Sequence, residues 1–268
     1  MPVDDESLRL ACFLGVFILI AASEVLVPRR VLAARKIRRW FTHLTLSALN
    51  TILLRFSFPF LVVAAAAYAE QQQWGLFNAL PLPDWLTIIA SLLVLDLAIY
   101  LQHIAFHHVP FLWRLHRVHH TDTDFDVTTG IRFHPLEIVL SMAFKMVLVV
   151  LLGAPVIAVL LFEIILSSSS LFNHGNIRLP AKLDALLRYI IVTPDMHRIH
   201  HSIYDEETNS NFSFNLPWWD KLFGTYRAQP RNSHEQMIIG QDCFREIREL
   251  RLDQLLIQPF RTPPADVD

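Results

Sequence analysis

The chain has 268 residues, of which 53% are hydrophobic and only 18% charged, a low charged fraction for a soluble domain. Its mean hydropathy is +0.36, and its formal net charge of −2 gives no indication of a nucleic-acid partner, so none is expected. Two cysteines, Cys12 and Cys243, exclude a disulfide framework and a thiolate zinc site.

The chain contains several apolar stretches near the ~20 residues that a transmembrane helix needs. The first three are Leu10–Val27, Leu44–Ala69 and Trp85–Ala105. A fourth, Leu136–Phe172, is long enough for two passes and is interrupted by Gly153-Ala154-Pro155, which predicts a helical hairpin that enters and leaves on one side. A soluble fold would have to bury all of them as core helices. We therefore expect an all-α integral membrane protein with about three transmembrane helices plus this hairpin.

Flanking charges predict how the helices are oriented. The leader MPVDDESLRL carries three acidic residues against one basic residue, the wrong balance for a signal peptide, so the first stretch is expected to be a retained helix. Pro28–Trp40 holds six basic residues and Glu70–Asp84 holds none. The positive-inside rule then predicts that the N-terminus and residues 70–84 lie outside and residues 28–42 in the cytoplasm. The third helix ends among the first histidines, which predicts a cytoplasmic helical cap and a multi-pass protein with its active site facing the cytoplasm.

Nine of the 13 histidines fall into clusters whose spacing suits one face of a helix. In chain order they form H-x3-H, H-x2-HH, a single histidine and a second H-x2-HH: His103 and His107; His116, His119 and His120; His174; His197, His200 and His201. Neutral imidazole is a common ligand of zinc, iron, copper and nickel. Because a tetrahedral zinc takes about four ligands, nine imidazoles are too many for one ion and about right for two. The alternative is that histidines occur by chance and form hydrogen bonds in loops. This alternative would explain His43 and His234, but it explains a repeated H-x2-HH poorly.

Ionisable residues inside apolar stretches indicate functional positions, because an unpaired carboxylate in the membrane is costly. Asp96, Tyr100, His103 and His107 are spaced four, three and four residues apart and form one stripe of the third helix. We predict that Asp96 accepts a hydrogen bond from a ligand imidazole; the alternative is a carboxylate that caps or pairs locally. Glu163 shares a helix face with the single histidine eleven residues later, and its partner is a basic group, the metal centre or substrate.

The clusters contain few carboxylates, whereas hydrolytic two-metal sites and ferritin-like di-iron sites depend on them. We infer that neutral imidazoles leave two irons with most of their positive charge. This favours an oxygen-derived oxidant strong enough to remove hydrogen from an unactivated C–H bond, as a lipid substrate would require. The zinc protease signature H-E-x-x-H is absent, since His234-Glu235 is not followed by a second histidine.

The run D-x3-Y-x2-H-x3-H…LWRLHRVHH (Asp96–His120) resembles the core of the fatty acid hydroxylase/sterol desaturase superfamily, the membrane-bound histidine-box di-iron oxygenases. The resemblance extends, in order, to TTGIRFHPLE, NHGNIRLP, VTPDMHRIHHS and WDKLFGTY and covers about residues 90–227. It implies a di-iron, dioxygen-dependent membrane enzyme that hydroxylates, desaturates or oxidises a lipid with electrons from an external donor. By position, the nine clustered histidines would be the metal ligands. Asp96, Tyr100 and His134 would lie next to these ligands without binding the metal themselves.

Two positions depart from the family pattern: Ile104 stands in a box that often reads H-R-x-x-H, and Ser213 stands where glycine is frequent. Neither change removes a ligand, and both are expected to reshape the substrate entrance. His108 points about 100° away from His107 on a helix and is left out of the ligand set.

The resemblance divides the chain into three parts: N-terminal membrane helices and basic loop (1–89), the histidine-box domain (90–227) and a polar C-terminal tail (228–268). With 7 glycines and no G-x-G spacing, and with no C-x-x-C-H, the chain carries neither a Rossmann site nor a haem-attachment motif. Electrons are therefore expected from a separate ferredoxin or cytochrome b5-like donor. The expected cofactors are two iron ions, for which zinc can substitute on overexpression, and dioxygen is the co-substrate.

Three functions fit these features. The favoured one is a lipid oxidoreductase that hydroxylates or desaturates a sterol, fatty acyl or related chain. The second is a membrane zinc-dependent hydrolase or isomerase that uses the same histidines, which metal content and dioxygen dependence would distinguish. The third is non-enzymatic: a haem-bearing electron carrier would show a Soret band, and a metal transporter would need more polar residues in the membrane than Asp96 and Glu163.

Overall fold

The computed structural model of the protein describes residues 5–32, 36–58 and 62–263. Among them the only β-type pairings are two isolated bridges, so the predicted all-α class is confirmed. Five segments are long and apolar enough to cross a membrane: Asp5–Leu26, Lys36–Ala79, Asp84–His108, Pro135–Leu152 and Val156–Asn173. The second of them runs over residues 59–61, which lie outside the described part of the chain.

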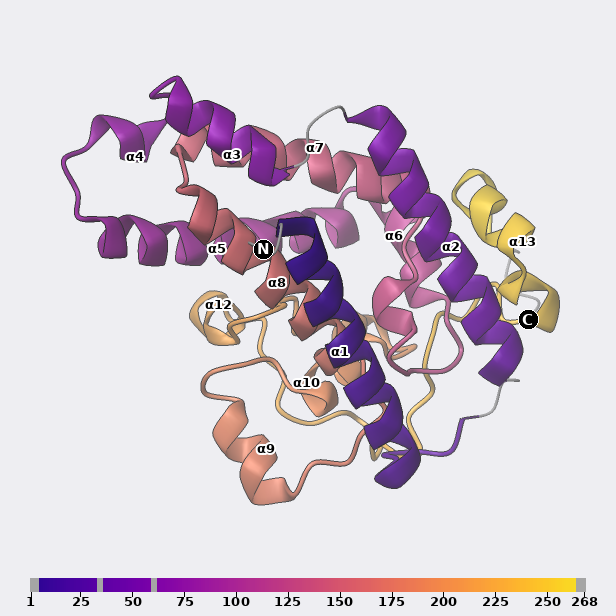
Figure 1. Ribbon diagram of the computed structural model, residues 1–268. Helices are drawn as coiled ribbons and strands as arrows, with labels where there is room; N and C mark the ends of the chain where they lie inside the picture. The colour runs from indigo at the N-terminus through magenta and orange to yellow at the C-terminus, as the bar shows by residue number, and fades with distance from the viewer. Residues whose placement is uncertain (1–4, 33–35, 59–61, 264–268) are drawn as a thin grey trace.

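Figure 1 shows long helices in the first two thirds of the chain and short helices joined by longer loops in the last third. The first half of the chain forms α1 (Asp5–Leu26), α2 (Lys36–Ser57), α3 (Val62–Gln71), α4 (Leu76–Ala79), α5 (Asp84–His108) and α6 (Pro110–His120). The second half forms the 3-10 turn η1 (Thr129–Ile131), α7 (Pro135–Leu152), α8 (Val156–Asn173), α9 (Ala181–Leu187), α10 (Pro194–His200), α11 (Asp205–Thr208), α12 (Trp218–Phe223), η2 (Ile247–Leu250), α13 (Leu252–Ile257) and η3 (Gln258–Phe260).

The apolar stretch Leu44–Ala69 is not one continuous helix as predicted. In the described residues α2 ends at Ser57 and α3 begins at Val62, and the two helices run in different directions (Figure 1). Residues 59–61 between them lie outside the described part of the chain.

The predicted hairpin of Leu136–Phe172 is present as α7 and α8. Gly153 ends α7 with a φ of 62°, a left-handed conformation that favours glycine, and Pro155 precedes α8. Gly75, with a φ of 99°, approaches so closely that a Cβ added to it would lie 2.1 Å from the Gly153 nitrogen. The connection between α3 and α4 therefore touches the tip of the hairpin.

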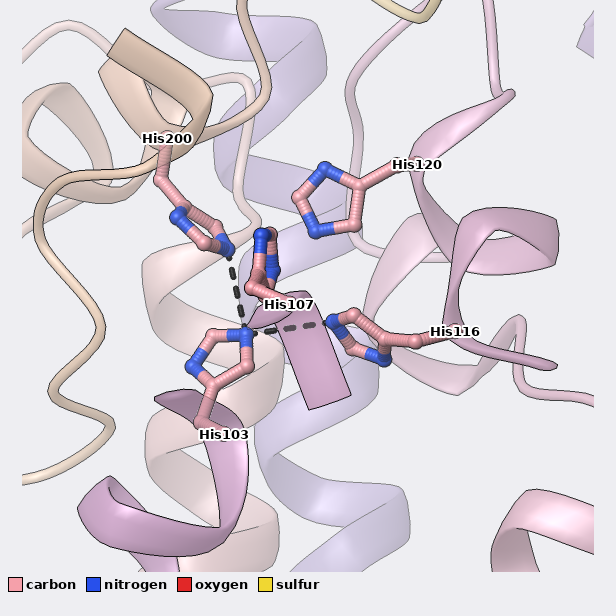
Figure 2. A group of neighbouring side chains, drawn as sticks. All are labelled: His103, His107, His116, His120 and His200. Carbon is pink, nitrogen blue, oxygen red and sulfur yellow. Dashed lines mark hydrogen bonds between the residues drawn. The ribbon is translucent and has the colours of Figure 1, made fainter. Parts of the chain in front are cut away.

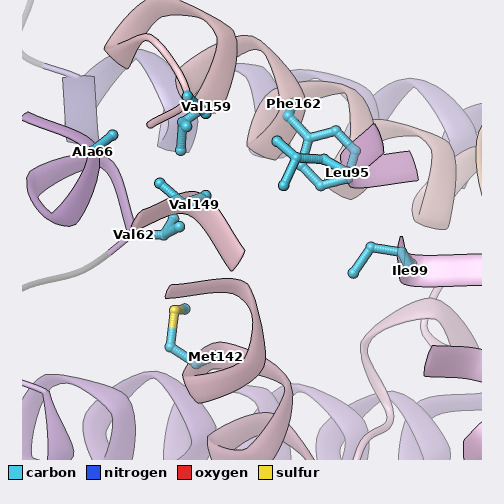
Figure 3. Packing of buried hydrophobic residues seen from close by; sticks show 9 residues of the cluster. Val62, Ala66, Leu95, Ile99, Met142, Val149, Val159 and Phe162 are labelled. Atoms are coloured by element: carbon cyan, nitrogen blue, oxygen red, sulfur yellow. The ribbon is translucent and has the colours of Figure 1, made fainter. Parts of the chain in front are cut away.

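One apolar cluster packs α3, α5, α7 and α8 together (Figure 3). Its buried members are Val62, Ala66, Leu95, Ile99, Met142, Val149, Ala154, Val159 and Phe162. Close packing of such side chains is what holds helices together where lipid removes the hydrophobic driving force. This bundle fixes the direction of α5 and α8, both of which end at the histidine clusters.

The helix α1 runs along the second half of α8 and not along the whole hairpin. Arg9 near its start pairs with Glu163, seven residues into α8, so α1 is displaced from the hairpin tip by roughly 10 Å. Near its end Ile20 shares a buried cluster with Leu171 and Ile177. The outward side of α1 is apolar and exposed, as expected for a helix in contact with lipid.

A buried ionic network joins α2 to the loop that follows α6. Arg39 donates to both carboxylate oxygens of Asp122 (2.8 and 2.9 Å) and to Asp126 (2.8 Å), and Arg132 lies 3.2 Å from Asp122. Burial raises the pKa of Asp122, but the two guanidinium groups outweigh it and hold that pKa well below its usual range. Two buried arginines thus balance two buried aspartates and fix the chain just after the second histidine box.

The C-terminal segment, predicted as a polar tail, packs against the rest of the protein. Leu255 of α13 is fully buried with Leu46 of α2 and Val118 of α6, and Arg117 donates to the carbonyl oxygens of Gln258 and Arg261. The tail therefore covers the outer face of the helix that carries three of the clustered histidines.

Candidate metal centre

Four helix ends bring the nine clustered histidines together. The last turns of α5 and α6, the end of α8 and the short helix α10 supply them, and all nine except the half-buried His107 are buried. Proline at the first position of α6 and of α10 favours the start of each short helix, and Thr193 caps α10 by accepting a hydrogen bond from the Met196 amide.

The nine rings form two groups, and within each group one ring nitrogen per residue lies within 4.8 Å of the others. The first group, whose rings point toward a common centre in Figure 2, consists of His103, His107, His116, His120 and His200. The second group consists of His119, His174, His197 and His201. The groups adjoin, because the rings of His120 and His201 stack with centroids 4.4 Å apart.

Each H-x2-HH box contributes to both groups. On α6 the pair four residues apart, His116 and His120, belongs to the first group, while His119 belongs to the second. The α10 box is divided the opposite way, with His200 in the first group and its two neighbours in the second. The prediction that the three histidines of one box point the same way is therefore wrong: the two boxes face each other, and each spans the gap between the groups.

Hydrogen bonds on the far side of the rings direct nitrogen lone pairs into the first group. The Nδ1 atoms of His103 and His200 lie 2.6 and 2.8 Å from the carbonyl oxygens of Phe212 and Ser210, and Nδ1 of His116 lies 2.7 Å from Glu137 Oε1. These oxygens accept, so each Nδ1 carries the hydrogen and each Nε2 keeps its lone pair.

Those Nε2 atoms nevertheless lie close together, 3.1 Å from His103 to His116 and 3.1 Å from His103 to His200. Converging lone pairs repel one another unless a cation lies among them. The arrangement therefore fits a bound metal ion better than a network of imidazole–imidazole hydrogen bonds.

In the second group the ring nitrogens are equally close, and a hydrogen bond to a carbonyl fixes the tautomer of His174. Nδ1 of His174 donates to the Ser170 carbonyl at 2.7 Å, and its Nε2 lies 3.1 Å from His119 Nε2 and 3.0 Å from His197 Nε2.

Burial of a polar nitrogen without a partner is costly, yet both ring nitrogens of His107, His120 and His201 are buried without a hydrogen bond. Metal coordination would satisfy them.

Burial also keeps these rings neutral. It lowers the pKa of His174 and of His200 to about 3, and it lowers the pKa of His119, His197 and His201 well below the ordinary histidine value. Neutral imidazole is the form that binds metals, so the lone pairs are available for coordination at physiological pH.

The prediction that Asp96 binds a ligand imidazole is wrong in the described structure. Its carboxylate accepts from Trp219 Nε1 and Asn215 Nδ2, both at 2.8 Å, and from the Leu216 amide at 3.3 Å. The hydroxyl of Tyr100 likewise lies 2.9 Å from Thr225 Oγ1 and not beside a histidine. Both residues hold the segment 215–225, which includes α12, because the side chains and amide of this segment lie within hydrogen-bond distance of the α5 stripe.

That segment acts on the centre through its backbone. Asp220, fully buried, accepts from the amides of Phe212 and Ser213 at 2.8 and 3.0 Å, and the Phe212 carbonyl in turn accepts from His103. Sequence reasoning did not single out Asp220, although it lies in the quoted WDKLFGTY block.

The remaining histidines lie outside both groups. His134 was predicted to lie behind the ligands, but it caps α7 by accepting from the Leu136 amide and bonds to the Leu256 carbonyl of the C-terminal segment. His108 is exposed and turns to the Ile104 carbonyl, as helical geometry predicted. His43 bonds to Thr128, and His234 lies 3.5 Å from Asp195.

Glu137 is the residue behind the ligands that sequence reasoning missed. It is 4% exposed and lies in the same RFHPLE block as His134, and the available signal was an acidic side chain at the start of an apolar stretch. Its carboxylate is placed to fix the tautomer and orientation of the His116 ring.

We expect Glu137→Gln to weaken metal retention by about 10–100-fold, the usual cost of losing a group that orients a metal ligand. Metal content after a timed chelator challenge would measure this. Glu206→Gln, on the exposed surface of α11, is the matched control. Equal metal retention in the two variants would contradict the role assigned to Glu137.

A cavity of about 520 Å³ opens beside the first histidine group. Helices α1, α2, α5, α7 and α8 enclose it, and His103 and His116 form part of its wall. Ile104 and Ser213, where the sequence departs from the family pattern, are not among the described residues that line it, and the expectation that they reshape a substrate entrance stays a prediction.

Comparison with known proteins gives a family match and several curated relatives. A model described as fatty acid hydroxylase matches residues 88–225. Ornithine lipid hydroxylase OlsE of Rhizobium tropici is 30% identical over 177 residues, which cover 66% of this chain and 52% of that protein. Human alkylglycerol monooxygenase is 29% identical, with 63% and 36% covered, and human cholesterol 25-hydroxylase is 27% identical, with 53% and 51% covered.

The chain thus spans about half, or less, of the length of these relatives. No solved structure matches it. The matched residues contain every member of the two histidine groups as well as Glu137 and Asp220.

Proposed function

Since the chain belongs to the fatty acid hydroxylase family, we propose that it is a membrane-bound, dioxygen-dependent lipid oxygenase whose two histidine groups hold two iron ions. The relatives named above are lipid hydroxylases and monooxygenases, which supports a lipid-acting oxidoreductase. The observation that carries the metal assignment is the convergence of Nε2 atoms at 3.0–3.1 Å in both groups, with their lone pairs fixed inward by hydrogen bonds in the first group.

Bound iron would supply the one-electron and dioxygen chemistry needed to oxidise an unactivated C–H bond. The chain's own residues hold and insulate the site. Neutral imidazoles leave the metal charge largely uncompensated, Glu137 and the Phe212 and Ser210 carbonyls fix the ring orientations, and burial keeps bulk water away. The cavity beside His103 and His116 would position the lipid chain.

We further propose that electrons arrive from a separate donor, a ferredoxin or a cytochrome b5-like protein. The support is that the sequence contains no G-x-G spacing and no C-x-x-C-H.

Turnover should require dioxygen. With 18O2 and a reducing system, the lipid product should gain one labelled oxygen if the enzyme hydroxylates, or lose two hydrogens if it desaturates; mass spectrometry of lipids from cells with and without the gene would identify the substrate. A product that forms equally well without oxygen and keeps all its original atoms would favour the zinc-dependent hydrolase or isomerase instead.

We propose that the centre faces the cytoplasm, because six basic residues lie in Pro28–Trp40 and none in Glu70–Asp84. In a background with Cys12 and Cys243 replaced by serine, Gln72→Cys and Asp205→Cys should react with an impermeant thiol reagent from opposite sides. Both positions are exposed, and permeabilised membranes provide the control for reactivity. Labelling from the same side would show that the topology is wrong.

A further inference from the structure

The cavity beside the metal centre has a charged group at its other end. Glu163 of α8 accepts from Lys145 of α7 at 2.7 Å and from Arg9 of α1 at 2.9 Å, and all three side chains line the cavity. Glu163 and Lys145 have side chains only 7% and 13% exposed. We call these three residues the charged pole of the cavity.

The other charged side chains of the cavity wall are already paired. Glu137 is engaged by His116 at the metal end, and Arg55 pairs with Glu6 at 2.7 Å where both are more than half exposed. At the charged pole, however, two cations share one carboxylate. The pole itself therefore carries one excess positive charge, whereas the negative charge of Glu137 lies at the opposite, metal end of the cavity.

The position of the pole makes this excess charge significant. Lys145 and Glu163 lie near the middle of α7 and α8, the two arms of the membrane hairpin, where a charged side chain is costly. An apolar pair would hold the two arms together at least as well as a buried ion pair. Two cations and one anion at this depth instead suit the binding of a further anionic group.

The distance from the pole to the histidines suits an extended lipid chain. Eight residues of α7 separate Lys145 from Glu137, which contacts His116, a rise of about 12 Å. Seven residues of α8 separate Glu163 from Ser170, which contacts His174, a rise of about 10 Å. The wall between is mainly apolar and includes Ile99, Met142, Leu166 and Phe214.

We propose that the charged pole binds an anionic group, a carboxylate or a phosphate, carried by the lipid substrate itself. The lipid then extends along the cavity and presents a carbon several methylenes from that anion to the histidine groups. This inference rests on the proposed lipid oxygenase and narrows its substrate to an anion-bearing acyl lipid, in preference to a neutral sterol or alcohol.

Equilibrium binding tests the proposal without turnover. Metal-loaded protein in neutral detergent would be kept anaerobic, at an alkaline pH that ionises free fatty acid. Palmitate and hexadecanol would each displace a fluorescent long-chain probe. We expect palmitate to bind about tenfold more tightly, the factor that one charge-assisted hydrogen bond supplies. Because no product is measured, this result is independent of whether the protein is an oxygenase.

Three variants separate substrate binding from a structural role. Lys145→Gln should abolish the preference for palmitate while leaving hexadecanol binding unchanged, and Arg9→Gln, at the more exposed cation, should act in the same direction. Glu163→Gln weakens the same ion pairs with Lys145 and Arg9, but it removes the negative charge of the pole. It should therefore increase the preference for palmitate over hexadecanol. Lys182→Gln on the exposed surface of α9 is the control and should match wild type.

Equal losses of palmitate and hexadecanol binding in the Lys145 and Glu163 variants would show that the pole only holds the helices together, and would overturn the proposal. A wild-type protein that binds palmitate and hexadecanol equally tightly would also overturn it. Inorganic phosphate should not displace the probe, since the anion must be attached to a lipid chain; displacement by phosphate alone would assign the pole to a soluble anion.

Discussion

Replacement of His107 by alanine should abolish turnover and remove bound metal, whereas replacement of its neighbour His108 should change neither. His107 belongs to the first histidine group and both its ring nitrogens are buried without a hydrogen-bond partner, while His108 is exposed and bonds only to the Ile104 carbonyl. We expect the loss in rate for His107→Ala to exceed the roughly 100-fold typical of a residue that merely orients a ligand.

Metal analysis and a lipid product assay on the two variants would measure these effects. The wild-type protein should carry about two metals per chain, iron when iron is supplied and zinc in part after overexpression. Membrane insertion of His107→Ala should be normal, because insertion depends on the apolar helices. A His107→Ala protein that keeps two metals would remove this residue from the ligand set, and a wild-type protein that takes up one metal or none on anaerobic reconstitution would contradict the dinuclear proposal.

His200→Ala and His119→Ala extend the test to the division between the two groups. Both should abolish activity, but each removes a nitrogen from a different group, so each should weaken retention of a different metal. Sequential metal loss under chelator, followed spectroscopically, would distinguish them. Identical loss of both metals in both variants would indicate that the groups bind metal as one unit.

Replacement of Arg39 by methionine should destabilise the fold by about 3–5 kcal/mol, since it leaves Asp122 and Asp126 buried without their main partner. All three side chains are 0% exposed, so solvent water cannot replace the hydrogen bonds that either carboxylate would lose. The effect should also reach the centre, because Asp122 follows His120 by two residues.

Denaturant or thermal unfolding in mild detergent would measure the loss. Arg251→Ala is the matched control: its partner Asp253 is as exposed as Arg251 itself, and a surface pair of this kind contributes at most about 1 kcal/mol. Equal stability of the Arg39 and Arg251 variants would show that the buried network does not hold α2 in place.

The features that depend on short stretches of sequence could be predicted. Hydropathy over about 20 residues located the apolar helices, and Gly153 followed by Pro155 indicated the hairpin turn because each residue limits the backbone locally. The nine histidines were identified because helical spacing places residues three and four apart near one another.

The features that depend on which helices meet were decided by tertiary structure. Asp96 lies on the same stripe as His103, yet it bonds to Asn215, 119 residues away, because the α11–α12 segment folds back against α5. Helical spacing turns adjacent histidines of an H-x2-HH box about 100° apart, but which group each histidine joins follows from α6 and α10 facing each other. Glu137 and Lys145 owe their partners to the position of α7 beside α6 and α8. A sequence specifies the residues a helix presents on each face, but the partner of a buried polar side chain is fixed only when another helix brings it within hydrogen-bond distance.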